Sequence, residues 1–305
     1  MTGYLLRRTL LVLPLLFGVA TVVFALIHLI PGDPVEVMLG AGAGAADVAD
    51  LRHRLGLDRP LPEQYGAFIG GLARGDLGLS LRYHDPIAGL LLERAPATGA
   101  LALASLGIAF LLAIPGAVGA AMKPGGRVEW LTSLGAVLAL SIPTFWLGPI
   151  LILLFAIRLN WLPASGFDSP AALLLPALTL ALPLAGLLTR LIRATLLEQT
   201  SAIYLRAARA RGLSLGAAMV RHALRNALAP VITVIALQLG SLMTGAILTE
   251  TVFAWPGLGR LLVQAISTRD YPLVQGSVLL IAMTYILTNL AADLLHGLLD
   301  PRTVA

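Results

Sequence analysis

The chain has no cysteine, a single lysine and few charged residues of either sign. Without cysteine it can form no disulfide bond, thiolate metal site or cysteine nucleophile. The one lysine, Lys123, is followed by Pro124, so a phosphate loop ending in Gly-Lys-Ser/Thr is absent and the chain cannot hold ATP in that way. Charged residues make up 12% of the 305 residues, about half their share in a soluble domain.

What the chain has in quantity is apolar sequence. Hydrophobic residues make up 58% of it, too much for a soluble fold of this length to bury, so the lipid bilayer is the expected solvent. Six stretches are long enough to span a membrane and contain no charged residue: Leu10–Ile30, Ala97–Met122, Leu131–Ile157, Ala171–Thr189, Leu228–Thr249 and Tyr271–Ala292. We therefore predict an all-α membrane protein with six transmembrane helices.

Prolines interrupt four of these stretches, at Pro115, Pro143, Pro176 with Pro183, and Pro230. They either kink helices that must move or are simply tolerated, as prolines often are in membranes. We expect the first stretch to be a retained anchor rather than a cleaved signal, because no small-residue cleavage site follows it.

The distribution of arginine predicts the orientation. Arg7 and Arg8 precede the first span and place the N-terminus in the cytoplasm, and six crossings return the C-terminus to the same side. Segment 31–94 then lies outside, where nine acidic residues outnumber six arginines. Seven arginines follow the fourth span on the inner side: Arg190, Arg193, Arg206, Arg209, Arg211, Arg221 and Arg225. This pattern favours a membrane topology over nucleic-acid binding, and we expect no nucleic-acid partner.

The longest predicted cytoplasmic loop, 191–227, contains a helix–glycine–helix pattern. Tyr204–Arg211 reads as a helix, Gly212 ends it, and Ser214 can cap a second helix running to about Ala227. Small alanines beside a glycine turn would let another protein approach closely. The alternative is an amphipathic helix on acidic lipid headgroups, and the residues alone do not decide between the two.

Ala207-Ala208, three residues, Gly212 and then Pro230 resemble the "EAA" loop of binding-protein-dependent ABC importer permeases. The string Tyr204-Leu-Arg-Ala-Ala-Arg-Ala-Arg-Gly-Leu-Ser214 is similar to that of the dipeptide/oligopeptide/nickel branch. Further matches cover the chain in order: Ile30-Pro-Gly-Asp-Pro34, Arg221-His-Ala-Leu-Arg-Asn-Ala227, Phe253-Ala-Trp-Pro-Gly-Leu-Gly-Arg260, Arg269-Asp-Tyr-Pro272 and Asp300-Pro-Arg302.

This resemblance implies a type-1 ABC importer permease domain over 96–297. The N-terminal tip and first helix (1–30), an extracytoplasmic region (31–95) and a cytoplasmic tail (298–305) complete the chain. The implied partners are a second homologous permease, two ATPase subunits that carry ATP and Mg, an extracytoplasmic binding protein and the lipid bilayer. The chain itself is then a non-catalytic subunit in a bacterial cytoplasmic membrane, with no cofactor, metal or catalytic residue of its own.

The resemblance assigns ATPase coupling to loop 191–227, with the residues Tyr204, Arg206, Ala207, Ala208, Gly212, Ser214, Arg221 and Asn226. Arg206 stands where the loop's name-giving glutamate would be, and no acidic residue precedes Tyr204. We therefore expect the contact to depend on small residues and the glycine turn rather than on a salt bridge.

Two other groups of residues are candidate functional sites. For the turn between the fifth and sixth spans the resemblance implies an outer gate or a binding-protein contact, with an interfacial anchor as the alternative: Trp255, Pro256, Gly257, Gly259 and Arg260. A polar stripe on the fifth span either lines the pathway or hydrogen-bonds neighbouring helices: Gln238, Ser241, Thr244 and Glu250.

The substrate class remains open at this point. Di- or oligopeptides are expected, with glutathione and nickel as alternatives, because selectivity in such systems lies largely on the binding protein. Two hypotheses from other classes are disfavoured. A stand-alone secondary transporter would show internal repeats and charges at mid-membrane. An intramembrane hydrolase would need a nucleophile with a base or a metal motif, and the five histidines do not form His-Glu-x-x-His.

Overall fold

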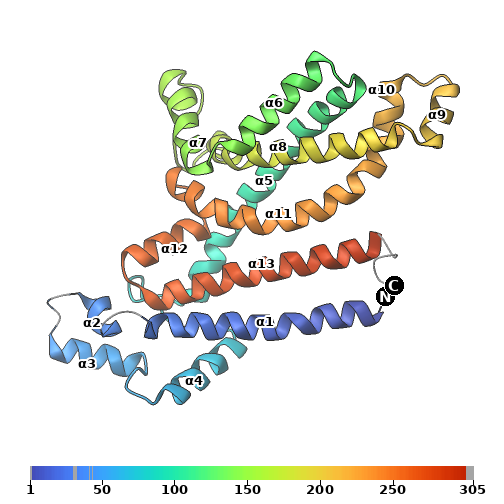
Figure 1. Cartoon of the computed structure of the whole chain (residues 1–305). Coiled ribbons are helices and arrows are strands. Elements are labelled where there is room, and N and C mark those ends of the chain that lie inside the picture. The colour runs from blue at the N-terminus through green and yellow to red at the C-terminus, as the bar shows by residue number, and fades with distance from the viewer. Residues whose placement is uncertain (1, 30–32, 41, 43, 300–305) are drawn as a thin grey trace. The chain divides into compact units, whose positions relative to one another are not determined.

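The computed structural model describes residues 2–29, 33–40, 42 and 44–299, and every regular element in these ranges is a helix (Figure 1). The side chains of residues 2–8, 229, 230, 233, 236, 237, 239, 241, 243–245, 292, 293 and 295–299 lie outside this description. The α-helices are α1 Thr2–His28, α2 Pro34–Leu39, α3 Ala45–Arg54, α4 Leu61–Ala73, α5 Ile87–Met122, α6 Arg127–Ser141, α7 Thr144–Leu151, α8 Leu174–Gln199, α9 Ile203–Ala210, α10 Leu215–Ala218, α11 Leu224–Val252, α12 Leu258–Ser267 and α13 Tyr271–Leu299.

Several of these helices are long and apolar enough to cross a bilayer. Among the described residues four single helical segments qualify, Thr9–His28, Ile87–Met122, Pro170–Gln199 and Tyr271–Ala291, and the bent pair α6–α7 would make a fifth. These five overlap five of the predicted spans. The remaining prediction, Leu228–Thr249, coincides with α11, part of whose side chains lies outside the description, Pro230 included.

The predicted span Leu131–Ile157 is broken rather than continuous. Helix α6 ends at Ser141, α7 begins at Thr144, and the two helical arms are bent by 106°. Pro143 explains the break, because proline disfavours helical geometry in the residue before it, and Ile142 is extended with φ −85° and ψ 119°. Pro115 and Pro183, by contrast, lie inside α5 and α8 without ending them.

The chain divides into two compact units, which we describe separately. The central unit comprises Thr98–Pro256 and Thr288–Ala305, and the N-terminal unit comprises Thr2–Ala97 and Gly257–Leu287. In the central unit α8 packs against α6 and α11, as Figure 1 shows. The backbones of α8 and α6 approach closely at Gly186, where an added Cβ would lie 2.7 Å from the carbonyl oxygen of Ala136. Only glycine allows the two backbones to approach so closely.

The N-terminal unit has its own hydrophobic core. Ile87 and Leu91, at the start of α5, pack with Leu258, Leu261, Ala265 and Leu273. On the other side of the unit α4 packs on α1 through Phe24 and Tyr65, whose ring centroids are 5.2 Å apart. The Tyr65 hydroxyl also hydrogen-bonds the Thr21 hydroxyl at 2.7 Å. Helix α4, which belongs to the segment 31–94 predicted to be extracytoplasmic, is therefore anchored on the first helix.

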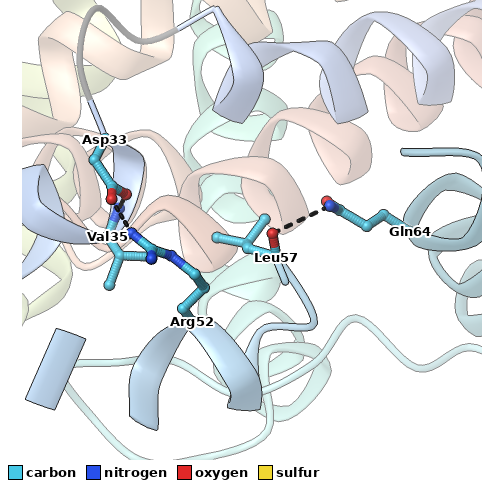
Figure 2. A network of polar contacts seen from close by, with 5 residues as sticks. All are labelled: Asp33, Val35, Arg52, Leu57 and Gln64. Carbon is cyan, nitrogen blue, oxygen red and sulfur yellow. Dashed lines mark hydrogen bonds and ion pairs between the residues drawn. The ribbon is translucent and has the colours of Figure 1, made fainter. Parts of the chain in front are cut away.

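Asp33, from the Ile30-Pro-Gly-Asp-Pro34 string, begins the first short helix of this unit (Figure 2). Its Oδ1 accepts a hydrogen bond from the Val35 backbone N–H at 3.0 Å, and Pro34 occupies the first helical turn. Its Oδ2 is paired with the Arg52 guanidinium of α3. Nearby, the Gln64 side chain of α4 donates to the Leu57 carbonyl at 3.4 Å. The aspartate of this string thus caps α2 and holds α3 beside it.

Candidate functional site

The segment predicted to couple to an ATPase contains α9, a two-turn helix with distinct inner and outer faces. Leu205 and Ala208 are almost completely buried against the rest of the central unit, each 1% exposed. The outer face carries Ile203, which is 84% exposed, together with Tyr204 and Ala207. The Tyr204 hydroxyl donates to the Gln199 side-chain oxygen at 2.8 Å and ties α9 to the end of α8.

Ala207 and Ala208, the two alanines that resemble the EAA loop, therefore lie on different faces of α9. Ala207 is free to meet a partner, whereas Ala208 packs inside the chain. The sequence pattern did not reveal this division, nor did it single out Ile203 as a large exposed apolar residue. Arg206, Arg221 and Asn226 are exposed, as a contact surface requires.

Gly212 ends α9 in a Schellman turn. Its φ is +92°, its N–H bonds the Arg209 carbonyl at 2.9 Å, and the Leu213 N–H bonds the Ala208 carbonyl at 3.3 Å. An added Cβ would meet nothing within 4 Å. The left-handed backbone conformation, rather than lack of space, is what requires glycine at this position.

Ser214 begins the next helix, as the sequence predicts. Its Oγ accepts from the Ala217 N–H at 3.3 Å and so caps α10. Helix α10 continues through a π-helical segment, Met219–Ala223, directly into α11. Segment 191–227 is consequently less of a loop than expected, because α8 continues to Gln199 and only residues 200–202 and 211–214 are outside helices.

Residues 212–216 also spell Gly-x-Ser-x-Gly, the pattern of the nucleophile elbow in hydrolases. That elbow places its serine on a sharp strand-to-helix turn. Here Ser214 stands between two helices and its hydroxyl oxygen is occupied as a cap. The pattern therefore lacks the structural setting that would make the serine a nucleophile.

An ion pair near the coupling segment was not predicted. The Arg193 guanidinium of α8 is paired with the carboxylate of Glu129 at the start of α6, and the two side chains are only 28% and 19% exposed. The second oxygen of Glu129 accepts from the Gly125 N–H. The pair joins the 123–127 turn to the helix that leads to α9, and a separation of 64 residues hides it from any local pattern.

The predicted outer turn contains buried rather than interfacial aromatic residues. Trp255 is 3% exposed and meets Phe167 edge-to-face, with ring centroids 4.8 Å apart. Phe253, at 1% exposure, accepts from the Gly166 N–H through its carbonyl oxygen at 3.2 Å. Phe167 thus packs on the ring of Trp255, and the gate, the binding-protein contact and the alternative of an interfacial anchor all stay predictions for this residue.

The remaining residues of this turn divide between the two units, Pro256 closing one stretch of the central unit and Gly257 opening a stretch of the N-terminal unit. Gly257 precedes α12 as its N-cap residue, Gly259 is buried, and Arg260 is half-buried. Their assignment to a gate or a binding-protein contact stays a prediction.

The pathway candidates of α11 are mostly shielded or outside the description. Glu250 is completely buried, and its Oε1 accepts a 2.6 Å hydrogen bond from the hydroxyl of Thr98 on α5. Gln238 is half-buried. The side chains of Ser241 and Thr244 lie outside the described residues. In this conformation Glu250 joins two helices, which is the hydrogen-bonding alternative raised for the polar stripe.

Comparison with known proteins decides the family. Residues 113–305 match the family described as "Binding-protein-dependent transport system inner membrane component", and residues 1–102 match its N-terminal companion. The chain belongs to this family. The permease is 42% identical to the di/tripeptide transport system permease protein DppB of Pseudomonas aeruginosa (strain UCBPP-PA14), over 99% of this chain and 98% of that one.

Other relatives cover the permease equally well. It is 40% identical to the dipeptide transport system permease protein DppB of Escherichia coli K12 and 39% identical to the glutathione transport system permease protein GsiC of E. coli O6:H1, each over 99% of this chain and 98% of the relative. The resemblance seen in the sequence motifs is thereby confirmed. The permease is a multi-pass membrane component of a transport system, non-catalytic itself, and its family implies an ATPase and a substrate-binding protein as partners.

Two solved structures share the fold. A chain of the MetNI methionine ABC transporter in inward-facing conformations aligns with a TM-score of 0.55 at 20% identity, covering 69% of the permease and 96% of that chain. A chain of an amino acid ABC transporter with histidines aligns with a TM-score of 0.51 at 18% identity, covering 70% and 94%. At these identities the comparison concerns the fold alone.

Proposed function

We propose that the permease forms half of an ATP-driven import path for di- and tripeptides. It pairs with a second homologous permease, and two ATPase subunits carry the ATP and Mg. Relatives that match over 99% of the chain are named as di/tripeptide and dipeptide transport permeases, which supports peptides as substrates. A relative named for glutathione transport, at 39% identity, makes that tripeptide the second candidate.

The proposed topology has six crossings with both termini in the cytoplasm. Its support is the charge distribution, with arginines clustered in 190–225 and acidic residues in excess in 31–94. On this topology α9 lies on the cytoplasmic side, where an ATPase would meet it.

The observation that carries the coupling proposal is the two-faced character of α9. Its inner face is buried through Leu205 and Ala208, and the Tyr204 hydroxyl joins it to Gln199 at the end of α8. Its outer face offers Ile203 and Ala207, an apolar patch among arginines, to a partner. A partner that moves on binding ATP would therefore move the helices attached to α9.

Transport in proteoliposomes tests the function. The permease is reconstituted with its co-purified ATPase and permease partners and a binding protein, and uptake of labelled Ala-Ala is followed with and without ATP. We expect ATP-dependent peptide uptake, competed more strongly by dipeptides than by glutathione. Stronger competition by glutathione would make glutathione, rather than di- and tripeptides in general, the proposed substrate. Proton-driven uptake by this chain alone would contradict the proposal.

A pair of alanine substitutions tests the coupling face. Ala207→Asp places a charge on the outer face of α9, whereas Ala46→Asp does the same at an exposed position of α3 in the other unit. We expect Ala207→Asp to lower binding-protein-stimulated ATPase activity at least about tenfold and Ala46→Asp to leave it unchanged. Full stimulation with Ala207→Asp would contradict α9 as the contact.

A further inference from the structure

A buried carboxylate, Asp270, organises one end of the N-terminal unit. The residue is 1% exposed and precedes α13. Its Oδ2 accepts from the Ser80 hydroxyl at 2.5 Å and from the Arg82 backbone N–H at 3.2 Å, and its Oδ1 accepts from the Leu273 N–H at 3.2 Å. All three donors are neutral, so the carboxylate is stabilised by dipoles and by the start of α13 rather than by an arginine.

The same network fixes the shape of loop 78–87. The Ile87 N–H bonds the Gly78 carbonyl at 3.0 Å, and the Ser80 N–H bonds the Asp85 carbonyl at 3.0 Å. The Ser80 hydroxyl oxygen also accepts from the Tyr83 N–H at 3.0 Å. Arg82 therefore projects from a loop whose backbone is held on both sides.

Two arginines flank Asp270 without pairing with it. Arg82 reaches it through a backbone N–H, and Arg269 is its neighbour in the chain. Arg269 is held in the left-handed region at φ +58°, and its Nη1 donates to the Val37 carbonyl at 3.1 Å. Within the described part of the chain neither guanidinium forms an ion pair, so both retain donors for an outside anion.

Both arginines line one cavity of about 1000 Å³, inside the N-terminal unit. Its wall also carries Asp47 and the ion pair of Asp50 and Arg54, in which Oδ2 of Asp50 lies 2.7 Å from Nη2 of Arg54. Asp47 has no ion pair in the ranges that the structure describes. The charges of the lining without an ion-pair partner among the described residues are thus the guanidinium groups of Arg82 and Arg269 and the carboxylates of Asp47 and Asp270, of which Asp270 is already hydrogen-bonded through both oxygens to Ser80, Arg82 and Leu273. The cavity volume suits a small ligand.

We propose that this cavity binds a short peptide through its two charged ends. Arg82 and Arg269 hold the C-terminal carboxylate, for which guanidinium forks provide paired, charge-assisted hydrogen bonds. Asp47 attracts the N-terminal ammonium group. The proposal rests on the proposed peptide import and adds to it a substrate contact on the permease itself, in the part of the chain predicted to be extracytoplasmic.

Peptide binding to the purified permease in lipid nanodiscs tests this site. Saturation-transfer NMR is recorded with Ala-Phe, with its C-terminal amide and with its N-acetyl form. We expect Ala-Phe to bind and the amide to bind at least about tenfold more weakly. The N-acetyl form should lose less affinity, because two arginines hold the peptide carboxylate whereas only Asp47 attracts its ammonium group. Equal binding of Ala-Phe and its amide, or no binding of either, would overturn the proposal.

Substitutions assign the effect to the arginines. Arg82→Gln and Arg269→Asn should each raise the Kd of Ala-Phe at least about tenfold, the asparagine being chosen because it tolerates a positive φ. Arg74→Gln is the matched control, because this exposed arginine follows α4 and does not line the cavity. An equal loss with Arg74→Gln would mean that general surface charge, and not this site, attracts the peptide.

Uptake measurements separate this inference from the proposed function. If ATP-dependent Ala-Phe uptake persists at full rate in Arg82→Gln, the import function stands and the cavity is not a substrate site. If the unsubstituted permease, in its full complex, neither binds nor transports the peptide, both proposals fail. The thermal unfolding temperature of each variant, compared with that of Arg74→Gln, shows whether a loss of binding comes from misfolding.

Discussion

The guanidinium of Arg193 on α8 is paired with the carboxylate of Glu129 at the start of α6. Because both groups are largely shielded, removing one leaves the other with a poorly solvated charge. We expect Glu129→Gln to lower the free energy of unfolding by about 1–3 kcal/mol. Thermal unfolding in detergent, with Arg193→Met and the double variant completing the cycle, measures the coupling between the two side chains.

An exposed ion pair provides the control for that experiment. Asp50 and Arg54 on α3 are 2.7 Å apart, but their side chains are 59% and 73% exposed. Asp50→Asn should therefore change stability by no more than about 0.5 kcal/mol. Equal destabilisation by the two substitutions would show that burial adds nothing to the Glu129–Arg193 pair.

Gly212 distinguishes backbone strain from steric clash. Since an added Cβ would meet nothing within 4 Å, any cost of substitution comes from φ +92°. We expect Gly212→Val to destabilise the turn by about 1–3 kcal/mol and to lower ATPase stimulation, while Gly212→Asn retains most of it. Stimulated ATPase activity of the reconstituted complex is the measurement, and equal activities of the two variants would count against the turn's importance.

The hydroxyl of Thr98 donates a hydrogen bond to the buried carboxylate of Glu250. Thr98→Val keeps the side-chain shape but removes the 2.6 Å hydrogen bond, so we expect a loss of about 1–3 kcal/mol in stability. Thr179→Val is the matched control, because that buried hydroxyl donates only to the Leu175 carbonyl of its own helix. Thermal unfolding should separate the two valine variants, and Thr98→Ser should recover the stability.

Two glycines on packed helices should respond oppositely to alanine. Gly186→Ala would bring a Cβ to 2.7 Å from the Ala136 carbonyl oxygen, which belongs to backbone and cannot move aside, so the unfolding temperature should fall. At Gly135 of α6 an added Cβ meets nothing within 4 Å. Gly135→Ala should leave the unfolding temperature unchanged or raise it, because alanine favours a helix by about 1 kcal/mol. A fall with Gly135→Ala as large as with Gly186→Ala would contradict this account.

Sequence reasoning succeeded where a single residue type dictates local geometry. Gly212 and Ser214 marked the end of one helix and the cap of the next. Pro143 lies at the sharp bend, but the sequence left open whether any of the prolines would bend its helix. Hydropathy located the apolar stretches but not the helix ends. Helix α5 begins at Ile87, ten residues before the predicted span at Ala97, because it continues through charged residues that a bilayer would exclude.

The contacts that escaped prediction join residues far apart in the chain. Thr98 and Glu250 are separated by 152 residues and Ser80 and Asp270 by 190, so no local spacing could pair them. The burial of Ala208 beside an exposed Ala207 escaped for a different reason. Both are small and apolar, and only the packing of α9 against its unit decides which one faces outward.

The run from α10 through the π-helical segment into α11 makes one continuous helical stretch of residues 215–252. Its α11 portion alone, 29 residues, spans about 43 Å at 1.5 Å per residue. Because the helix is continuous, a displacement at Ser214 would be passed along it toward Glu250, which is hydrogen-bonded to Thr98 of α5. Within residues 215–252 the π-helical segment Met219–Ala223 is the stretch with a wider turn, and a change of helical twist would be taken up there.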